Sequence, residues 1–128
     1  MKFVSTRGGH AAVSLETAIR QGIAADGGLF VPERMPARTW TDLPPSAPLP
    51  VLARNLVGQF ADPGPLLDSV DAICADAFNF PVPVMPLDRH PGPVSVLELF
   101  HGPTCAFKDF GARFLAAALE RIRDGRGP

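Results

Sequence analysis

The sequence predicts an α/β fold in which short strands alternate with amphipathic helices. Residues 1–36 have the pattern strand, helix, strand, and residues 62–77 and 106–123 have apolar side chains at helical spacing. An apolar run at residues 94–100 precedes the last helix. A strand followed by an amphipathic helix is half of a βαβ unit, which needs a second parallel strand. We therefore expect the chain to be part of a larger α/β protein.

The composition is that of a globular protein with no strong charge. The chain has 128 residues, of which 46% are hydrophobic, and a formal net charge of −1. Because it has no excess of basic residues, we do not expect it to bind nucleic acid. No apolar run approaches the roughly 20 residues of a membrane span, and the N-terminus lacks a signal-peptide core. A cytoplasmic location without membrane contact is expected. Cys74 and Cys105 are expected to be reduced, partly buried thiols, and no metal site is predicted.

The first 36 residues predict two short strands around one helix. We expect a strand at residues 2–5, a helix that Ser14 caps and Gly22 ends, and a strand at residues 29–31. Residues 26–28, Asp-Gly-Gly, are typical of a tight turn. A phosphate cradle is disfavoured there, because an apolar strand rather than a helix follows the glycines.

The middle of the chain predicts a connector and two helices. Residues 36–50 are rich in proline and contain the single tryptophan, Trp40. Residues 51–60 are weakly helical, and a better helix is expected to begin at Asp62-Pro63 and to run to residue 77. Its carboxylates fall largely on the polar face, which favours solvation over a catalytic pair: Asp68, Asp71 and Asp76.

The last third predicts a change of domain. Alternating prolines make residues 80–86 an extended bridge, so we place a boundary between residues 1–80 and residues 81–128. A strand at 94–100 then leads to a helix from about Ala106 to Arg123. The side chains expected to face a core are Phe107, Phe110, Phe114, Leu115, Ala118, Leu119 and Ile122.

Lys108 is the candidate functional residue. With Thr104 as the predicted cap, Lys108 falls in the first helical turn, where unpaired N–H groups disfavour a cation and favour the neutral amine. A neutral lysine flanked by Phe107 and Phe110 is a nucleophile suited to a Schiff base with a carbonyl. The alternative from the residues alone is an ordinary solvated surface lysine.

Three separated segments resemble one family, the threonine synthases, which use pyridoxal phosphate (PLP). The string Leu97 to Gly111, which includes Lys108, resembles the segment that carries the cofactor lysine. Residues 5–8, 13–22 and 26–32 resemble the N-terminal segment of the same family. The third resemblance covers Ala77 to Pro83. The resemblance implies a threonine synthase N-terminal domain over residues 1–80 and the first strand and helix of a fold-type II PLP domain over residues 81–128. Since the family is several times longer, an N-terminal portion is expected.

The resemblance implies an activity for the intact protein. O-phospho-L-homoserine and water would give L-threonine and phosphate, with Lys108 as both the Schiff-base lysine and a general acid/base. Cys105 departs from the family's string, where leucine is common. The loop for the PLP phosphate and most substrate contacts would lie beyond residue 128, so the 128-residue chain is expected to be inactive alone.

Two alternatives stay open at this point. One is a non-catalytic packing or self-association module, with a homodimer through the exposed C-terminal helix. The other is a different fold-type II enzyme, such as a serine or threonine dehydratase. Those enzymes resemble the lysine segment less well and lack a match to the opening from Ser5 to Pro32.

Overall fold

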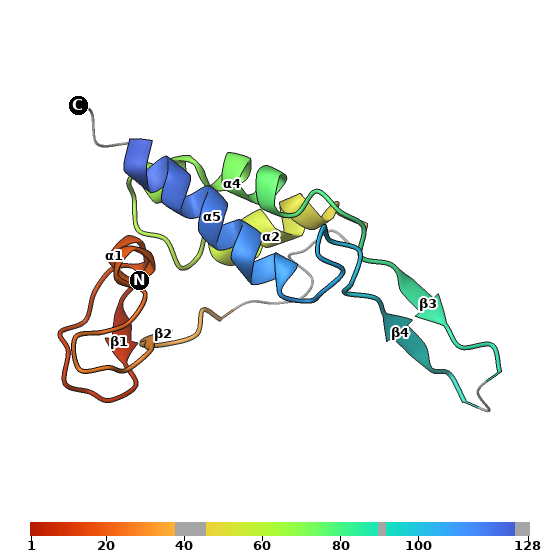
Figure 1. Cartoon of the computed structure of the whole chain (residues 1–128), viewed down its shortest axis with the longest axis horizontal. Coiled ribbons are helices and arrows are strands. Elements are labelled where there is room, and N and C mark those ends of the chain that lie inside the picture. The colour runs from red at the N-terminus through yellow and green to blue at the C-terminus, as the bar shows by residue number, and fades with distance from the viewer. Residues whose placement is uncertain (38–45, 90–91, 125–128) are drawn as a thin grey trace.

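The computed structural model describes residues 1–37, 46–89 and 92–124, and it contains both strands and helices, as the predicted α/β class requires (Figure 1). Within these ranges the elements in chain order are β1 (Phe3–Ser5), α1 (Leu15–Gln21), β2 (Phe30–Pro32), α2 (Leu49–Val57), α3 (Pro65–Asp68), α4 (Val70–Ala77), β3 (Val84–Pro86), β4 (Ser95–Leu97) and α5 (Asp109–Asp124). No helix in the described ranges is long and apolar enough to span a membrane.

The N-terminal strand, helix and strand are confirmed. Strands β1 and β2 pair antiparallel, with Phe3 opposite Pro32. The Ser14 hydroxyl accepts a hydrogen bond from Thr17 N at 3.2 Å and caps α1. Gly22 ends the helix with a φ of 71°, a backbone conformation that residues other than glycine rarely adopt.

The Asp-Gly-Gly segment is a tight turn, as predicted. The Asp26 carboxylate accepts hydrogen bonds from Ser5 Oγ at 2.7 Å, Gly9 N at 2.8 Å and Gly28 N at 2.9 Å. These bonds, the one from Ser5 first, lower the pKa of Asp26 below its ordinary value. A Cβ on Gly28 would lie 2.0 Å from Ser5 Oγ, so this close approach requires glycine.

A helical core holds the rest of the chain together. Helix α5 packs against α4, α3 and α1, and α2 packs against α4 on another side (Figure 1). Ile73, Cys74, Ala118 and Ile122 have at most 1% of their surface exposed. Phe114 contacts both buried clusters and so joins the α2–α4 contact to the α4–α5 contact.

The predicted helix over residues 62–77 is wrong in its start and its continuity. The helix begins at Pro65 rather than at Asp62, whose carboxylate pairs instead with the amino group of Met1. Ser69, with φ −100° and ψ 0°, interrupts it, so α3 and α4 are separate elements. Periodicity could not reveal this break, because the apolar residues keep helical spacing across it.

Helix α2 begins earlier than predicted. It starts at Leu49, inside the predicted connector, and carries Pro50 in its first turn. Proline is tolerated there because the first N–H groups of a helix have no partner within the helix. Residues 38–45 of the connector, including Trp40, lie outside the described residues.

The predicted extended bridge is part of a β-hairpin. Strands β3 and β4 pair antiparallel, with Val84 opposite Leu97, and all six of their residues are exposed. The hairpin extends away from the helices (Figure 1). Strand β4 is shorter than the predicted strand at 94–100, and its pairing in the described ranges is antiparallel. A parallel partner stays a prediction.

The predicted core face of the last helix is partly wrong. Ala118 and Ile122 are buried and Phe114 packs on both clusters, as expected. Phe107 and Leu115, however, are 68% and 44% exposed. Phe107 precedes the first helical residue, Asp109, and so does not continue the helical stripe.

Candidate lysine site at the start of helix α5

Lys108 lies immediately before α5 rather than in its first turn. Its carbonyl oxygen accepts a hydrogen bond from Ala112 N at 3.0 Å, so Lys108 itself stands at the helix cap that the sequence assigned to Thr104. The Lys108 side chain is exposed. Among residues 1–37, 46–89 and 92–124, none forms an ion pair or hydrogen bond with its ammonium group.

The residue after Lys108 is a buried carboxylate. Asp109 is only 4% exposed, and both of its oxygens accept hydrogen bonds from Thr104. Thr104 N donates to Oδ2 at 2.9 Å, and Thr104 Oγ1 donates to Oδ1 at 2.9 Å. Thr104 therefore binds the carboxylate of the first helical residue instead of capping the helix.

The turn between Gly102 and Asp109 is tightly wound. Cys105 N donates to Gly102 O at 3.0 Å, and Cys105 has a φ of 55°, a rare left-handed conformation for a residue with a side chain. A Cβ on Gly102 would lie 2.3 Å from Asp109 Oδ2, so only glycine leaves room for the carboxylate. Asp109 N closes the turn by donating to Ala106 O at 3.1 Å.

The two phenylalanines beside Lys108 have different surroundings. The Phe110 ring lies 5.0 Å from Phe80 and 6.2 Å from Phe78, against the helical core. Phe107 contacts Phe110 at 5.7 Å but is largely exposed. Phe107 and Phe110 thus flank Lys108 along the chain, but the Lys108 side chain is exposed to solvent.

A polar contact that sequence reasoning did not find precedes the turn. His101 Nε2 lies 2.6 Å from Glu98 Oε2, and the His101 ring stacks on Phe100 with centroids 4.8 Å apart. The spacing of three residues was the available signal in the sequence, but outside a helix this spacing does not predict a side-chain contact.

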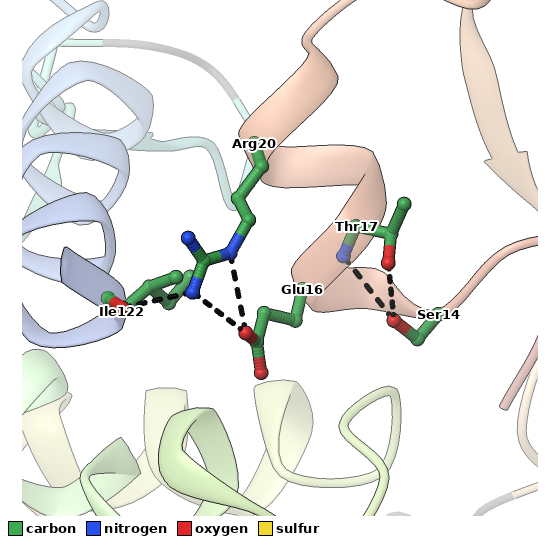
Figure 2. A network of polar contacts seen from close by, with 5 residues as sticks. All are labelled: Ser14, Glu16, Thr17, Arg20 and Ile122. Carbon is green, nitrogen blue, oxygen red and sulfur yellow. Dashed lines mark hydrogen bonds and ion pairs between the residues drawn. The ribbon is translucent and has the colours of Figure 1, made fainter. Parts of the chain in front are cut away.

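Two arginines anchor α5 to its neighbours. Near its start, Arg113 donates from Nε to Ala77 O at 2.9 Å and from Nη2 to Asp76 O at 2.6 Å, at the C-terminal end of α4. Near its end, Arg20 of α1 donates to Ile122 O at 2.8 Å while pairing with Glu16 (Figure 2). The element that follows Lys108 is therefore held at both ends.

The comparisons with known proteins identify one family. The family model described as "Threonine synthase N terminus" matches residues 2–78. The match ends close to the predicted domain boundary after residue 80. That boundary stays a prediction, since α5 on its far side packs against α4.

Similar proteins carry the same name. Threonine synthase of Haemophilus influenzae is 39% identical over 89% of this chain, and that of Escherichia coli strain K12 is 34% identical over 95%. A solved structure of the E. coli threonine synthase superposes on 96% of the chain with a TM-score of 0.81 and 32% identity. A PLP-bound threonine synthase from Brucella melitensis superposes on 99% with a TM-score of 0.86 and 30% identity. These superpositions confirm the predicted fold class.

The likeness covers a limited part of each relative. This chain spans 26% of the length of the H. influenzae protein and 28% of the E. coli protein. It likewise covers 28% of each of the two solved chains. Within that part, nearly the whole of this chain is matched.

Proposed function

Since the chain belongs to the threonine synthase family, we propose that it supplies the lysine-bearing segment of a PLP-dependent threonine synthase, with Lys108 as the lysine that carries the cofactor. The proposed reaction converts O-phospho-L-homoserine and water into L-threonine and phosphate. The observation that carries this proposal is the exposed, unpaired Lys108 amine on a turn that Asp109 and Thr104 hold. It stands within a chain that superposes on a PLP-bound threonine synthase over 99% of its length.

The residues present fit covalent attachment of an aldehyde cofactor. Condensation with an aldehyde needs a primary amine that is accessible and that no carboxylate holds as a cation. Lys108 meets both conditions within the described ranges. The chain has one other lysine, Lys2, which lies beside β1 at the far end of the sequence. Lys2 therefore serves as an internal reference for an ordinary exposed lysine.

Lys108 would have two roles. Bound PLP supplies an electron sink that allows protons to leave the substrate. Lys108 Nζ would hold the cofactor covalently and, as a free amine, would accept and return the proton of the substrate α carbon. Its backbone is held at the start of α5, where Lys108 O accepts a hydrogen bond from Ala112 N at 3.0 Å, while its side chain is exposed.

The remaining parts of the site belong to a region that this chain does not match. The chain spans about a quarter of its relatives, and we assign the contacts to the PLP phosphate and most contacts to the substrate to the other three quarters. The 128-residue chain alone is then inactive. A cytoplasmic location and a homodimer through α5 stay predictions.

The lysine assignment is tested by trapping the adduct. PLP is added to the 128-residue chain, the imine is reduced with borohydride, and peptides are mapped for a pyridoxyl group. We expect labelling chiefly at Lys108, its loss in Lys108→Ala, and no change in the matched control Lys2→Ala. Equal labelling of Lys2, Lys108 and the Met1 amine would contradict selection of Lys108 by this chain alone and would assign that selection to the missing part of the site.

The substrate class needs the rest of an enzyme. Joining this chain to the E. coli threonine synthase in place of the 28% that it matches supplies the missing part. We expect phosphate release and threonine formation from O-phospho-L-homoserine, abolished by Lys108→Ala and retained in Lys2→Ala. Ammonia release from serine or threonine without threonine formation would favour a dehydratase instead. Turnover by the 128-residue chain alone would contradict its predicted inactivity.

A further inference from the structure

We propose that Asp109 is a positioning residue for Lys108: its buried carboxylate fixes the turn from which the lysine leaves the backbone. This inference rests on the proposed role of Lys108 as the cofactor lysine. Asp109 is one of two polar or charged side chains counted as buried in the described ranges. Burying a carboxylate is costly unless hydrogen bonds satisfy it, so its contacts require an explanation.

The carboxylate binds a single residue with both oxygens. Thr104 donates its backbone N–H to Oδ2 and its hydroxyl to Oδ1, each at 2.9 Å. Two bonds from one partner restrict both the position and the rotation of that partner, as a bidentate contact does. The residues between Thr104 and Asp109 are thereby closed into a small loop whose last member is Lys108.

The loop has little space in which to rearrange. Gly102 lies so close to the carboxylate that an added Cβ would be 2.7 Å from Asp109 Cβ and 2.8 Å from Asp109 Cγ. Cys105 holds a left-handed φ of 55°, a conformation that persists only where its surroundings impose it. Asp109 N and Cys105 N both donate to carbonyl groups of the same turn.

The backbone of Lys108 is thus fixed on both sides while its side chain is left free. On one side the clamp of Asp109 on Thr104 sets the turn, and on the other Ala112 N binds Lys108 O at 3.0 Å. The Lys108 ammonium itself makes no polar contact within the described ranges. A covalent anchor benefits from this arrangement, because a fixed point of attachment limits the positions that the cofactor can occupy.

The test separates the hydroxyl and carboxylate contributions. Asp109→Asn removes the negative charge: its one remaining oxygen is a neutral acceptor for Thr104 N–H, and its NH₂ group can donate to the Thr104 hydroxyl oxygen. Thr104→Val removes the hydroxyl at nearly constant shape, and Thr104→Ser is the matched control that restores it. Resistance of Cys74 to thiol reagents, which depends on the helical core, reports whether each variant is folded.

Two measurements on the 128-residue chain decide the inference. Hydrogen exchange of the Thr104 amide reports the clamp without any cofactor. In Asp109→Asn we expect about tenfold faster exchange, because the Thr104 amide then donates to a neutral acceptor instead of a charged one. Borohydride trapping with PLP then gives the ratio of label at Lys108 to label at Lys2. We expect this ratio to fall several-fold in Asp109→Asn and Thr104→Val and to recover in Thr104→Ser. A general loss of stability would not lower this ratio selectively.

The outcomes separate this inference from the proposed function. Retained threonine formation by Lys108→Ala in the joined enzyme would contradict the proposed cofactor role; the exchange measurement would still decide whether Asp109 fixes the turn. Preferential labelling that persists in Asp109→Asn would overturn the positioning role and leave the cofactor role standing. Unchanged exchange of the Thr104 amide in a folded Asp109→Asn variant would overturn it equally.

Discussion

Replacing Arg113 with alanine should destabilise the contact between α4 and α5. The guanidinium donates to Ala77 O at 2.9 Å, Asp76 O at 2.6 Å and Asn79 Oδ1 at 2.8 Å. It also lies 5.9 Å from the centre of the Phe80 ring. The carbonyl oxygens of residues 76 and 77 are among the last of α4, which have no partner within the helix and carry partial negative charge.

The magnitude follows from these contacts. A hydrogen bond to a charged group contributes roughly 1.5–3 kcal/mol when buried, and solvent reduces this for a half-exposed arginine. We expect Arg113→Ala to lower the free energy of unfolding by about 2 kcal/mol. Arg113→Lys should recover only part of this loss, because an ammonium cannot reproduce the planar fork.

Urea unfolding followed by circular dichroism at the helical band measures this effect. The matched control is Arg121→Ala. Arg121 lies further along α5, and its Nη2 pairs with Asp76 Oδ2 at 2.5 Å. That carboxylate is 59% exposed, so we expect a loss of at most about 1 kcal/mol. Equal losses in Arg113→Ala and Arg121→Ala would refute the reasoning, since it attributes the difference to the α4 carbonyls.

Three further predictions concern the pH dependence, the thiols and the core. The hydrogen bond from Ser5, followed by those from backbone amides, lowers the pKa of Asp26. The ionised carboxylate therefore stabilises the fold above pH 3.8, the ordinary pKa value, and this stabilisation is lost as the pH falls below that value. Asp26→Asn should flatten the acid side of a stability profile measured by urea unfolding. Burial raises the pKa of Cys74 to about 11, whereas Cys105 is exposed, so a chromogenic disulfide reagent at about pH 8 should modify Cys105 rapidly and Cys74 only on unfolding; two fast equivalents in the native chain would contradict this. Ile73 is fully buried, and Ile73→Ala should cost roughly 2–5 kcal/mol in the same urea assay, with a loss under about 1 kcal/mol showing that the site is not part of the core.

Local signals in the sequence were sufficient for the N-terminal part of the fold. Ser14 and Gly22 set the bounds of α1 because a cap acts on backbone groups within three or four residues of itself. The turn at residues 26–28 was predicted for the same reason. In each case the residue type that sets the local conformation lies within a few positions of the backbone groups that it binds.

Contacts between distant residues account for the errors. The bond of Asp62 to the Met1 amine replaces the expected helix cap, and nothing near residue 62 announces it. The pairing of β3 with β4 depends on a register between residues about ten positions apart, in segments whose prolines suggest an unpaired chain. Side-chain periodicity likewise cannot show that Ser69 divides one predicted helix into two.

The lysine site contains both kinds of information. The sequence predicted a helix start near Lys108, but it began the helix at about Ala106 with Thr104 as its cap, whereas α5 begins at Asp109. In the structure Thr104 binds the side chain of Asp109 across five positions, a spacing that no regular element predicts.

The two ends of α5 have different surroundings, and this difference bears on the position of Lys108. In its second half Ala117, Ala118 and Ile122 are buried in the core, while the exposed Lys108 lies immediately before its first residue, Asp109. A helix is stiff over this distance, so core packing at one end restrains the position of the other end. The carboxylate of Asp109 then extends that restraint into the preceding turn. The backbone of Lys108 is therefore restrained while its side chain is exposed.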